Sequence, residues 1–339
     1  MSITAKELAK KLNLSATAVS MALNNKPGVS IGTRNLVIKT AEKYGYDFTR
    51  LSMKNRHSAD IYCVIYQAHN AILKYMPIFS ELTDGIEQEC RRQGYQLKLI
   101  RINENNSNLQ KCIEDLRIAH CAGIILLGTE TSLHVCKMFL QLSVPVVMLD
   151  SHFDSLGFSS VLINNCQGAY LATNFLIDQC GCQPGYMRSS YRIGNFEERK
   201  IGFDKAIREH GMSPSNSIVH ELPPSIDGAL TDMLEILDRK DSLANCYFAD
   251  NDLIAIGAMK ALKLRGYRIP DDISIVGFDN ISESRIVEPS LTTIDIPRTF
   301  MGQTGARQLI QQIEAPVPHT VKIEISTKLL KRFSVLKSS

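Results

Sequence analysis

The most constraining feature of the sequence is a regular alternation of apolar, strand-like runs and helical segments that begins at residue 61. The strand-like runs occupy 61–66, 96–100, 123–127, 144–149, 161–163, 185–187, 217–222, 245–248 and 273–276. The helical segments occupy 77–93, 109–118, 133–142, 167–179, 196–210, 228–237 and 253–265. Alternating strands and helices build parallel sheets with helices on both faces. Two such series predict an α/β fold with two lobes.

The first 45 residues have a different pattern, with three short helical segments and no strand. The spacing of Thr4 and Glu7 is that of a capping box, and Ser15 and Ser30 are placed to cap the second and third helices. Gly45 closes the third helix. Three short helices with a tight turn between the first two are typical of a helix-turn-helix, whose second helix enters the major groove of DNA. The alternative is a three-helix bundle that binds another protein.

The distribution of charge favours DNA as the partner. Residues 1–58 carry ten Lys or Arg against three acidic side chains, a net charge of +7, which leaves −4 on the other residues because the whole chain carries +3. A basic N-terminal region on a mildly acidic body points to a polyanion. The outward face of the second helix is small and mostly polar, so its backbone can approach base edges: Ala16, Thr17, Ser20, Met21 and Asn24.

The stretch ITAKELAKKLNLSATAVSMALNNKPGVSIGTR, residues 3–34, resembles the DNA-binding headpiece of the lactose-repressor/galactose-repressor family. Its most specific parts are V-S-x-x-L-N and G-V-S-x-x-T-R. The resemblance implies major-groove contacts by Ser15, Ala16, Thr17, Ser20 and Met21, and phosphate contacts by Thr4, Asn24, Ser30 and Thr33. Many members carry Arg or His in place of Met21. Methionine cannot form a bidentate bond with guanine, so we expect an apolar contact there.

The linker, residues 46–58, departs from the family pattern. Members of the family usually have a Pro and an Ala-x-x-Leu hinge helix that forms on DNA and inserts a Leu pair into the minor groove. This linker has neither feature, and it is basic. Leu51 or Met53 is the candidate apolar wedge, since such side chains kink DNA. The alternative is a flexible basic tether, and both interpretations stay open.

Polar residues follow several of the predicted strands in residues 59–339. They are Asp150, the run 250–252 and Asp279, and Arg199 lies early in a helix. In open α/β sheets, ligands bind outside the carboxyl ends of the strands. These residues are therefore the candidates for contacts with a small molecule.

Residues 59–339 also resemble the effector-binding and dimerisation domain of the same family, which has the two-lobed fold of periplasmic sugar-binding proteins. The matching pieces are PVVMLD (145–150), NFEERKIGF (195–203), NDLIAIGA (251–258), ISIVGFDN (273–280) and LTTI (291–294). The resemblance implies that the effector is bound by Asp150, Arg199, Asn251 and Asp279, over an apolar floor of Pro77 and Phe79. Acceptors with one Arg suit a sugar or sugar derivative. The chain has no Trp, so Phe79 or Tyr75 is expected to cover the sugar face.

The same resemblance implies a first lobe of residues 59–163 with 291–320, and a second of 164–290 with 321–339. One headpiece, residues 1–45, reads a half-site, and a palindromic operator matches two-fold protein symmetry, so we expect a homodimer. The expected function is that of a transcription repressor controlled by an effector, with activation as the alternative. Whether the effector weakens or strengthens DNA binding stays open.

Other classes of function lack their motifs. Neither G-x-G-x-x-G, nor G-x-x-x-x-G-K-[ST], nor a recognisable nucleophile motif occurs, so we expect no enzyme activity and no cofactor. The absence of a long apolar run and of a signal-peptide core predicts a cytoplasmic protein without membrane contact, rather than a sugar-transport protein. Cys180-Gly181-Cys182 is the only tight spacing among nine cysteines, and it lacks a second half. We therefore expect reduced cysteines that pack as small apolar residues, and no metal site.

Overall fold

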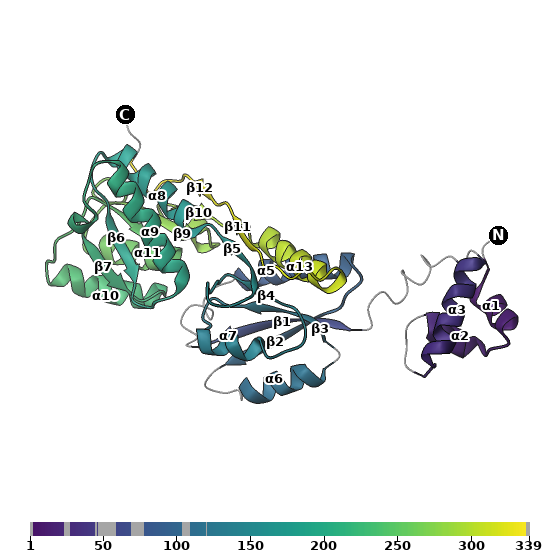
Figure 1. Ribbon diagram of the computed structural model, residues 1–339. Coiled ribbons are helices and arrows are strands. Elements are labelled where there is room, and N and C mark those ends of the chain that lie inside the picture. The colour runs from purple at the N-terminus through teal and green to yellow at the C-terminus, as the bar shows by residue number, and fades with distance from the viewer. Residues whose placement is uncertain are drawn as a thin grey trace. The chain divides into compact units, whose positions relative to one another are not determined.

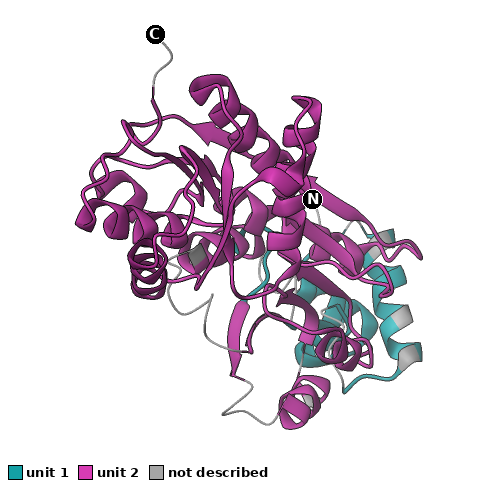
Figure 2. Cartoon of the chain, turned by 90° about the vertical axis from the view of Figure 1, so that its left-hand side faces the viewer, with its two compact units in different colours: residues 1–60, 91–96 teal, residues 61–90, 97–339 magenta. Residues whose placement is uncertain are grey.

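The computed structural model describes residues 3–23, 28–44, 46, 59–68, 78–103, 109–119 and 121–336. The chain forms two compact units, residues 1–60 with 91–96 and residues 61–90 with 97–339, which Figure 2 colours separately. No helix in these described ranges is long and apolar enough to cross a membrane.

The described part of the N-terminal region contains three helices, α1 (Ala5–Leu12), α2 (Ala16–Leu23) and α3 (Ile31–Lys43). They pack around a small buried core of Leu8, Ala9, Val19, Ala22, Val37 and Ala41. The predicted capping box is confirmed, because the Thr4 side chain accepts from the Glu7 N–H while the Glu7 carboxylate accepts from the Thr4 N–H. Ser15 Oγ accepts from the N–H of Ala18 at 3.0 Å, and so it begins α2.

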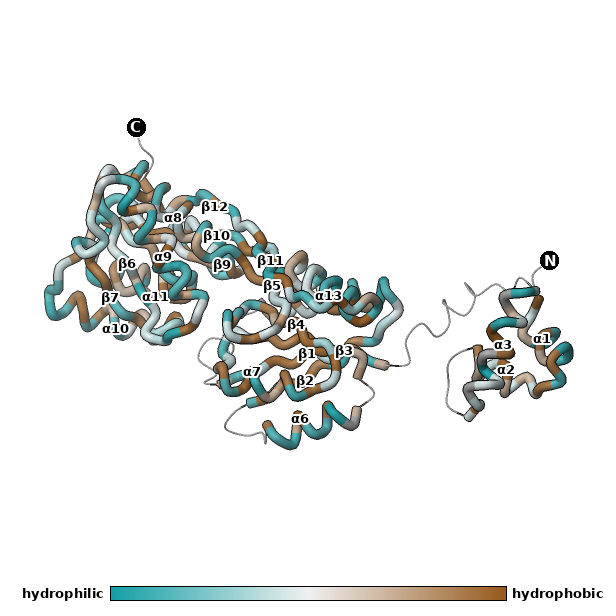
Figure 3. The backbone as a smooth tube through the Cα atoms, in the orientation of Figure 1, coloured by the Kyte–Doolittle hydropathy of each residue, from teal (hydrophilic) through white to brown (hydrophobic). Residues whose placement is uncertain are grey.

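The first sheet of the second unit has the strand order β11-β5-β4-β3-β1-β2 in the described residues. The strands are β1 (Asp60–Gln67), β2 (Leu97–Asn103), β3 (Cys121–Leu127), β4 (Val146–Leu149), β5 (Ser159–Ile163) and β11 (Lys322–Ile325). The pairs β1–β2, β3–β4, β4–β5 and β5–β11 are parallel. Figure 3 colours most of β1, β3 and β4 as hydrophobic, as expected for strands buried on both faces.

Helices cover both faces of this sheet (Figure 1). They are α5 (Ile78–Arg92), α6 (Leu109–Ile118), α7 (Leu133–Phe139) and α13 (Arg298–Glu314). Helices α6 and α7 share one apolar cluster with alternate residues of β1, including Tyr62 and Val64. On the other face, α13 lies against α5, and a Cβ at Gly302 would stand 2.1 Å from the Leu82 carbonyl oxygen. Glycine is therefore required there for the close approach of the two helices.

The second sheet has the strand order β12-β10-β9-β8-β6-β7 in the described residues. The strands are β6 (Gly185–Ser189), β7 (Val219–Leu222), β8 (Cys246–Ala249), β9 (Ser274–Asp279), β10 (Thr292–Asp295) and β12 (Lys328–Leu330). The pairs β9–β10, β8–β9, β6–β8 and β6–β7 are parallel, and β10–β12 is antiparallel. The predicted two-lobed α/β architecture with parallel sheets is thus confirmed.

The second sheet also carries helices on both faces. They are α8 (Asn165–Cys180), α9 (Gly194–Glu209), α10 (Ile226–Asp238) and α11 (Asp252–Leu264), with a short α12 (Glu283–Ile286) and a 3-10 turn at Pro214–Asn216. Helices α10 and α11 pack over Met187 and Tyr247 on one face. On the α8 and α9 side, the Phe203 ring stacks on Tyr186 with centroids 4.9 Å apart.

Two short strands near the C-terminus belong to the other sheet from the one that the predicted lobe boundaries imply. Residues 291–320 were assigned to the first lobe, but β10 belongs to the second sheet, where Thr292 pairs with Val276. Residues 321–339 were assigned to the second lobe, but β11 belongs to the first sheet, where Lys322 pairs with Ser160. The physical reason for the first difference is that β10 completes a buried site, since the Thr293 hydroxyl donates to Asp252 at 2.5 Å. The chain therefore crosses between the sheets again, between β11 and β12.

Candidate functional site

A cavity in the second unit lies at the carboxyl ends of strands from both lobes. It is lined by Phe79, Leu82, Leu127, Thr129, Asp150, Ile163, Ile193, Asn195, Phe196, Arg199, Asp279, Ile296, Arg298 and Met301. Asp150 directly follows β4 of the first lobe, and Asp279 ends β9 of the second. Parallel strands end at the same edge of a sheet, so both lobes present their strand-end side chains to this cavity.

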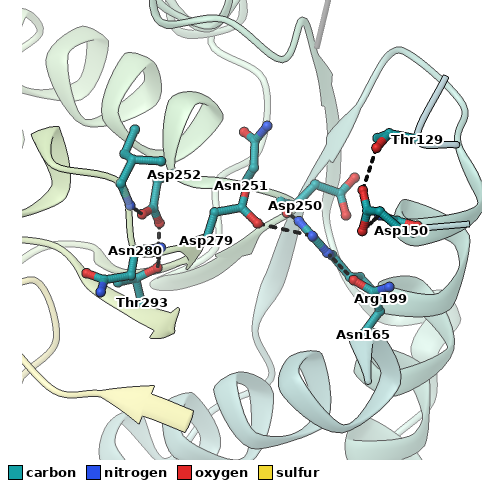
Figure 4. A network of polar contacts seen from close by, with 12 residues as sticks. Thr129, Asp150, Asn165, Arg199, Asp250, Asn251, Asp252, Asp279, Asn280 and Thr293 are labelled. Atoms are coloured by element: carbon teal, nitrogen blue, oxygen red, sulfur yellow. Dashed lines mark hydrogen bonds and ion pairs between the residues drawn. The ribbon is translucent and has the colours of Figure 1, made fainter. Parts of the chain in front are cut away.

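Arg199 lies at the centre of the polar network on the second lobe (Figure 4). Its Nε donates to Asn165 Oδ1 at 3.0 Å, and its Nη2 donates to Asp279 Oδ1 at 3.1 Å. Its Nη1 donates to the Asp250 carbonyl oxygen. The guanidinium carbon lies 3.7 Å from the centroid of the Phe278 ring. The guanidinium is therefore held in one orientation at a residue that is only 3 % exposed.

The approach of α9 to α8 brings Arg199 within reach of Asn165. A Cβ at Gly202, one turn after Arg199, would stand 2.1 Å from the Cys166 carbonyl oxygen. The glycine lets the two helices meet backbone to backbone at this level, so the side chain of Arg199 can reach the first residue of α8. Gly202 lies inside the segment NFEERKIGF (195–203), which carries the family resemblance, but its packing role is visible only in the structure.

Asp279 is the buried carboxylate that faces Arg199. Burial raises the pKa of its carboxyl, while Arg199 and Arg298 act in the opposite direction. Its Oδ2 is buried and has no hydrogen-bond partner among the described residues. Its backbone has a φ of 104°, a left-handed value that a residue other than glycine rarely adopts. Strained backbone of this kind concentrates at ligand-binding sites.

Asp150 is the corresponding carboxylate of the first lobe. Thr129 Oγ1 donates to its Oδ2 at 2.6 Å, and Asn195 Nδ2 donates to its Oδ1 at 2.9 Å. The second bond joins the two lobes, because Asn195 belongs to α9. Burial raises the pKa of Asp150 to about 6, against the opposing effect of the Thr129 hydrogen bond and the Arg199 charge. Asp150 also has a left-handed φ, of 59°.

Arg298 brings a second guanidinium to the cavity wall, at the first residue of α13. Its Nη2 donates to the backbone carbonyl oxygen of Asp279, and its Nη1 lies 3.5 Å from Glu81 Oε2. Its Nε is buried without a hydrogen-bond partner in the described part of the chain. Two residues that line the cavity therefore each carry a buried polar atom without a partner in the described part of the chain, a donor on Arg298 and an acceptor on Asp279.

Residues 250–252 lie behind the cavity lining, where the Asp250 carbonyl oxygen accepts a hydrogen bond from Arg199. Both oxygens of Asp250 are bonded, by the Tyr186 hydroxyl at 2.5 Å and the Ser189 N–H at 2.6 Å, and burial raises its pKa to about 6. Asn251 Oδ1 caps α11 by accepting from the Ile254 N–H at 2.9 Å. Burial raises the pKa of Asp252 to about 8. None of the three is among the residues that line the cavity.

The structure brings together four of the six effector-binding residues predicted from the sequence. Phe79, Asp150, Arg199 and Asp279 line one cavity, whereas Asn251 lies outside its lining with its Oδ1 used as a helix cap. Pro77 lies outside the described residues, as does Tyr75. Sequence reasoning missed the lining residues Thr129, Asn195, Phe196 and Arg298. Asn195 and Phe196 lie in a quoted segment, NFEERKIGF, so their place four and three residues before Arg199 could have indicated them.

The predicted DNA-contacting residues lie in the other unit. Ser15, Ala16, Thr17 and Ser20 are exposed on α2, and Met21 is half-buried. The Met21 sulfur lies 3.2 Å from where a Cβ at Gly28 would stand, so its side chain reaches toward the segment before α3.

Three of the predicted phosphate-contacting residues use their hydroxyls in hydrogen bonds within this unit. The Thr4 hydroxyl donates to Glu7, and the hydroxyls of Ser30 and Thr33 lie 2.8 Å apart. Asn24, Leu51 and Met53 lie outside the described residues.

The groups that line the cavity are suited to binding a ligand. Two carboxylates and two guanidiniums lie beside the rings of Phe79 and Phe196. The described ranges contain no group of three His, Cys, Asp or Glu side chains placed to hold a metal ion.

Comparison with known proteins gives the family. Residues 59–333 match the family model described as the periplasmic binding proteins and sugar binding domain of the LacI family. The chain belongs to the LacI family. The ribose operon repressor of Halalkalibacterium halodurans is 32 % identical over 332 residues, which cover 97 % of this chain and 96 % of that protein. This LacI-family chain is a transcription regulator and not an enzyme.

Two further proteins extend the comparison. The HTH-type transcriptional repressor PurR of Pasteurella multocida is 29 % identical over 98 % of both chains. The crystal structure of a LacI family transcriptional regulator from Enterococcus faecium with bound ribose has a TM-score of 0.70 and 25 % identity. It covers 82 % of this chain and all of that one.

Proposed function

We propose that the protein is a sequence-specific DNA-binding repressor whose operator affinity is controlled by a sugar or sugar derivative bound between the lobes. The observation that carries the proposal is a pair of buried polar atoms without a partner among the described residues, Asp279 Oδ2 and Arg298 Nε, on two residues that line the cavity. A buried polar atom without a partner costs about 1–3 kcal/mol. A hydroxyl group both donates and accepts hydrogen bonds, so a polyhydroxylated ligand can satisfy both atoms at once.

The remaining walls of the cavity fit the same class of ligand. Asp150 offers a carboxylate from the first lobe, and Asp279 and Arg199 offer an acceptor and a fixed cation from the second. The rings of Phe79 and Phe196 can cover the apolar face of a sugar. Two proteins compared above concern ribose, so a pentose is the first compound to test.

We propose that residues 1–45 form the helix-turn-helix and that α2 is the helix that enters the major groove. Support comes from the exposed row of Ser15, Ala16 and Thr17 at the N-terminal end of α2. The net charge of +7 on residues 1–58 supplies the attraction to phosphates. A relative of matching length is named an HTH-type repressor.

We propose that the repressor acts as a homodimer on a palindromic operator. One helix-turn-helix reads a half-site, so two-fold symmetry of the protein matches that of the DNA. Effector binding closes the cavity by adding contacts to Asp150 of one lobe and Asp279 of the other, which shifts the protein toward a closed form. Linkage then requires that DNA and effector change the affinity of one another by the same factor.

The test of this function is a sugar panel measured on the full-length protein by thermal unfolding, with ribose first. A ligand present at a hundred times its dissociation constant stabilises the folded state by about 2.7 kcal/mol. We expect at least one pentose or hexose to raise the melting temperature, and the same compound to change affinity for operator DNA selected from a randomised pool. If none of the sugars shifts the melting temperature while nucleobases or amino acids do, the sugar class is wrong.

Effector affinity is expected to fall as the pH drops through about 6, the pKa to which burial raises Asp150. A ligand hydroxyl that donates to Asp150 favours the ionised carboxylate, so protonation weakens binding by up to about tenfold per pH unit below that pKa. The ligand-free protein should respond in the opposite sense. Because the folded pKa is raised, the stability contributed by Asp150 is present below about 4 and is lost as the pH rises through 6.

Titration calorimetry between pH 5 and 8 checks both the size and the origin of this dependence. Asp150→Asn is expected to weaken binding at pH 8 and to flatten the profile. Asp84→Asn, on the exposed face of α5, is the matched control and should leave the wild-type profile unchanged. An unaltered profile in Asp150→Asn would assign the titration to another group.

A further inference from the structure

A second cavity lies beside the one described above, in the same unit of the chain. Its lining comes from the end of β1, from the residues that follow β3 and β4 in the first lobe, and from residues 191–194 at the start of α9 in the second lobe. Thr129 and Ile193 belong to the linings of both cavities. We call the cavity around Arg199 the inner cavity and the second one the outer cavity. The two are therefore neighbouring parts of one space between the lobes.

The two cavities differ in size. The inner cavity has a volume of about 50 Å³ and the outer cavity one of about 480 Å³. Pockets that bind small molecules usually measure about 300–1,000 Å³, whereas one water molecule takes up about 30 Å³ in the liquid. The inner cavity alone is therefore too small for a whole effector, and the outer cavity has the size of a ligand site. A ligand that contacts Asp279 and Arg298 extends past Thr129 into the outer cavity.

Aromatic rings from both lobes line the outer cavity. Phe153 follows β4 of the first lobe, and Tyr191 precedes α9 of the second. Phe153 is half-buried, whereas Tyr191 is 41 % exposed. Ligand pockets combine such apolar and aromatic side chains with a few polar groups that fix the orientation of the ligand. A sugar ring has an apolar face of C–H groups, so these two side chains can cover a sugar unit in the outer cavity.

The polar groups of the outer cavity can both donate and accept hydrogen bonds. Ser132 Oγ accepts from the Val135 N–H at 3.3 Å, and its O–H can donate to a ligand. Ile193 provides no side-chain cap to α9, and the first N–H groups of a helix lack partners within it. A Cβ at Gly194 would stand in open space, so the backbone at the start of α9 is accessible to a ligand. Hydroxyl groups, which both donate and accept, match this mixture.

The charges around the outer cavity favour a neutral ligand. Glu130 and Arg192 bring one charge of each sign to its lining. Both ring nitrogens of His152 are already bonded, Nδ1 to Ser160 Oγ at 2.9 Å and Nε2 to Asp154 Oδ1 at 3.1 Å. A phosphate site would instead offer cationic donors, typically arginine in bidentate pairs. The described lining therefore has no surplus of positive charge that would select a phosphorylated sugar.

We propose that the effector is a neutral disaccharide that spans both cavities. One sugar unit contacts Asp279 and Arg298 in the inner cavity, and the second unit contacts Phe153 and Tyr191 in the outer cavity. This inference rests on the sugar-controlled function proposed above and narrows its ligand class from sugars in general to two linked units. Each unit contacts side chains of both lobes, so the outer unit adds to the preference of the effector for the closed form.

The experiment measures the affinity of the full-length protein for matched sugars by titration calorimetry. The monosaccharides are ribose, glucose and galactose, and the disaccharides are cellobiose, maltose, trehalose and lactose. We expect at least one disaccharide to bind at least about tenfold more tightly than its own monosaccharides, the gain from one added hydrogen bond to a charged group. A monosaccharide that binds as tightly as the best disaccharide would overturn this inference and leave the proposed function standing. Failure of every sugar to bind, with a nucleobase or amino acid bound instead, would overturn the proposed function itself.

Two variants test the position of the second sugar unit. Gly194→Leu fills the outer cavity at the start of α9, and Tyr191→Ala removes one of its rings, so each is expected to lower the affinity for the disaccharide toward that for the monosaccharide. The matched controls are Gly157→Leu, at another glycine whose Cβ would stand in open space, and Ile201→Ala, at an exposed side chain of α9. Both controls should keep the wild-type affinity for the disaccharide. Wild-type disaccharide affinity in Gly194→Leu and in Tyr191→Ala would overturn the assignment to the outer cavity.

Discussion

Replacement of Arg199 by alanine is expected to abolish the effector response and to lower the free energy of unfolding by about 3–5 kcal/mol, the usual cost of breaking a buried ion pair. The Arg199 and Asp279 side chains are 4 % and 2 % exposed, so water cannot replace the lost guanidinium. Asp279, Asn165 and the Asp250 carbonyl would all lose a donor. The cavity would also lose its fixed cation.

Chemical denaturation of the variant gives its stability, and the ligand-induced rise in melting temperature gives its response. Arg199→Lys keeps the charge but cannot reach three acceptors with the planar fork of a guanidinium, so it should recover part of the stability and little of the response. Arg188→Ala is the control in the same lobe. Arg188 is 20 % exposed and pairs with Glu197 at 2.9 Å, and its loss should cost less than about 1 kcal/mol. A normal response in folded Arg199→Ala would remove Arg199 from the proposed site.

The parts of the fold that could be predicted are those with long, repeated patterns. The alternation after residue 61 predicted a strand at each of β1 to β9. The carboxyl ends of two of these predicted strands identified Asp150 and Asp279 as candidate site residues. The late strands β10, β11 and β12 come after the last predicted strand–helix unit, and no helix separates β11 from β12, so the alternation ends there. Their sheet assignment depends on long-range pairing, such as Lys322 with Ser160, which no local signal carries.

The candidate site likewise contains residues that the sequence predicted and residues that it did not. Arg199 was predicted, but the residues that hold it come from separate elements: Asn165 from the start of α8, and the carbonyl of Asp250 from the end of β8. Arg298 was missed because it follows β10, a strand that the pattern did not predict. Asn251 stays a prediction, because a strand-end amide has two uses: its Oδ1 caps α11 by accepting from the Ile254 N–H, while its Nδ2 has no hydrogen-bond partner among the described residues.

The cysteines show that spacing in the sequence can hide a contact in the structure. The sequence separation of Cys182 and Cys246 conceals a contact of 3.8 Å between their sulfurs. Parallel strands joined by helices bring the beginnings of distant strands to one edge, as they bring their ends to the other. A motif that is incomplete in the sequence can therefore be completed by a residue more than sixty positions away.

Replacement of Met21 by arginine is expected to change which operator the protein prefers while effector affinity stays the same. Met21 is half-buried beside Gly28, at the same face of α2 as Thr17. An arginine there can form two hydrogen bonds to guanine, and such a pair discriminates between bases by about 1–3 kcal/mol, or about 5- to 150-fold. Selection from a randomised DNA pool should therefore enrich guanine at one position of each half-site.

Thr17→Ala tests the same helix by removal of a contact. Thr17 is exposed in the first turn of α2, and alanine is a better helix former, so the expected result is weaker base discrimination without loss of stability. Thr40→Ala is the matched control on α3, where the Thr40 hydroxyl donates to the Leu36 carbonyl at 2.7 Å, and it should keep the wild-type preference. The selected sequences of Met21→Arg and Thr17→Ala must both differ from those of the wild type if α2 reads the bases. Identical selections in all four proteins would move recognition to another element.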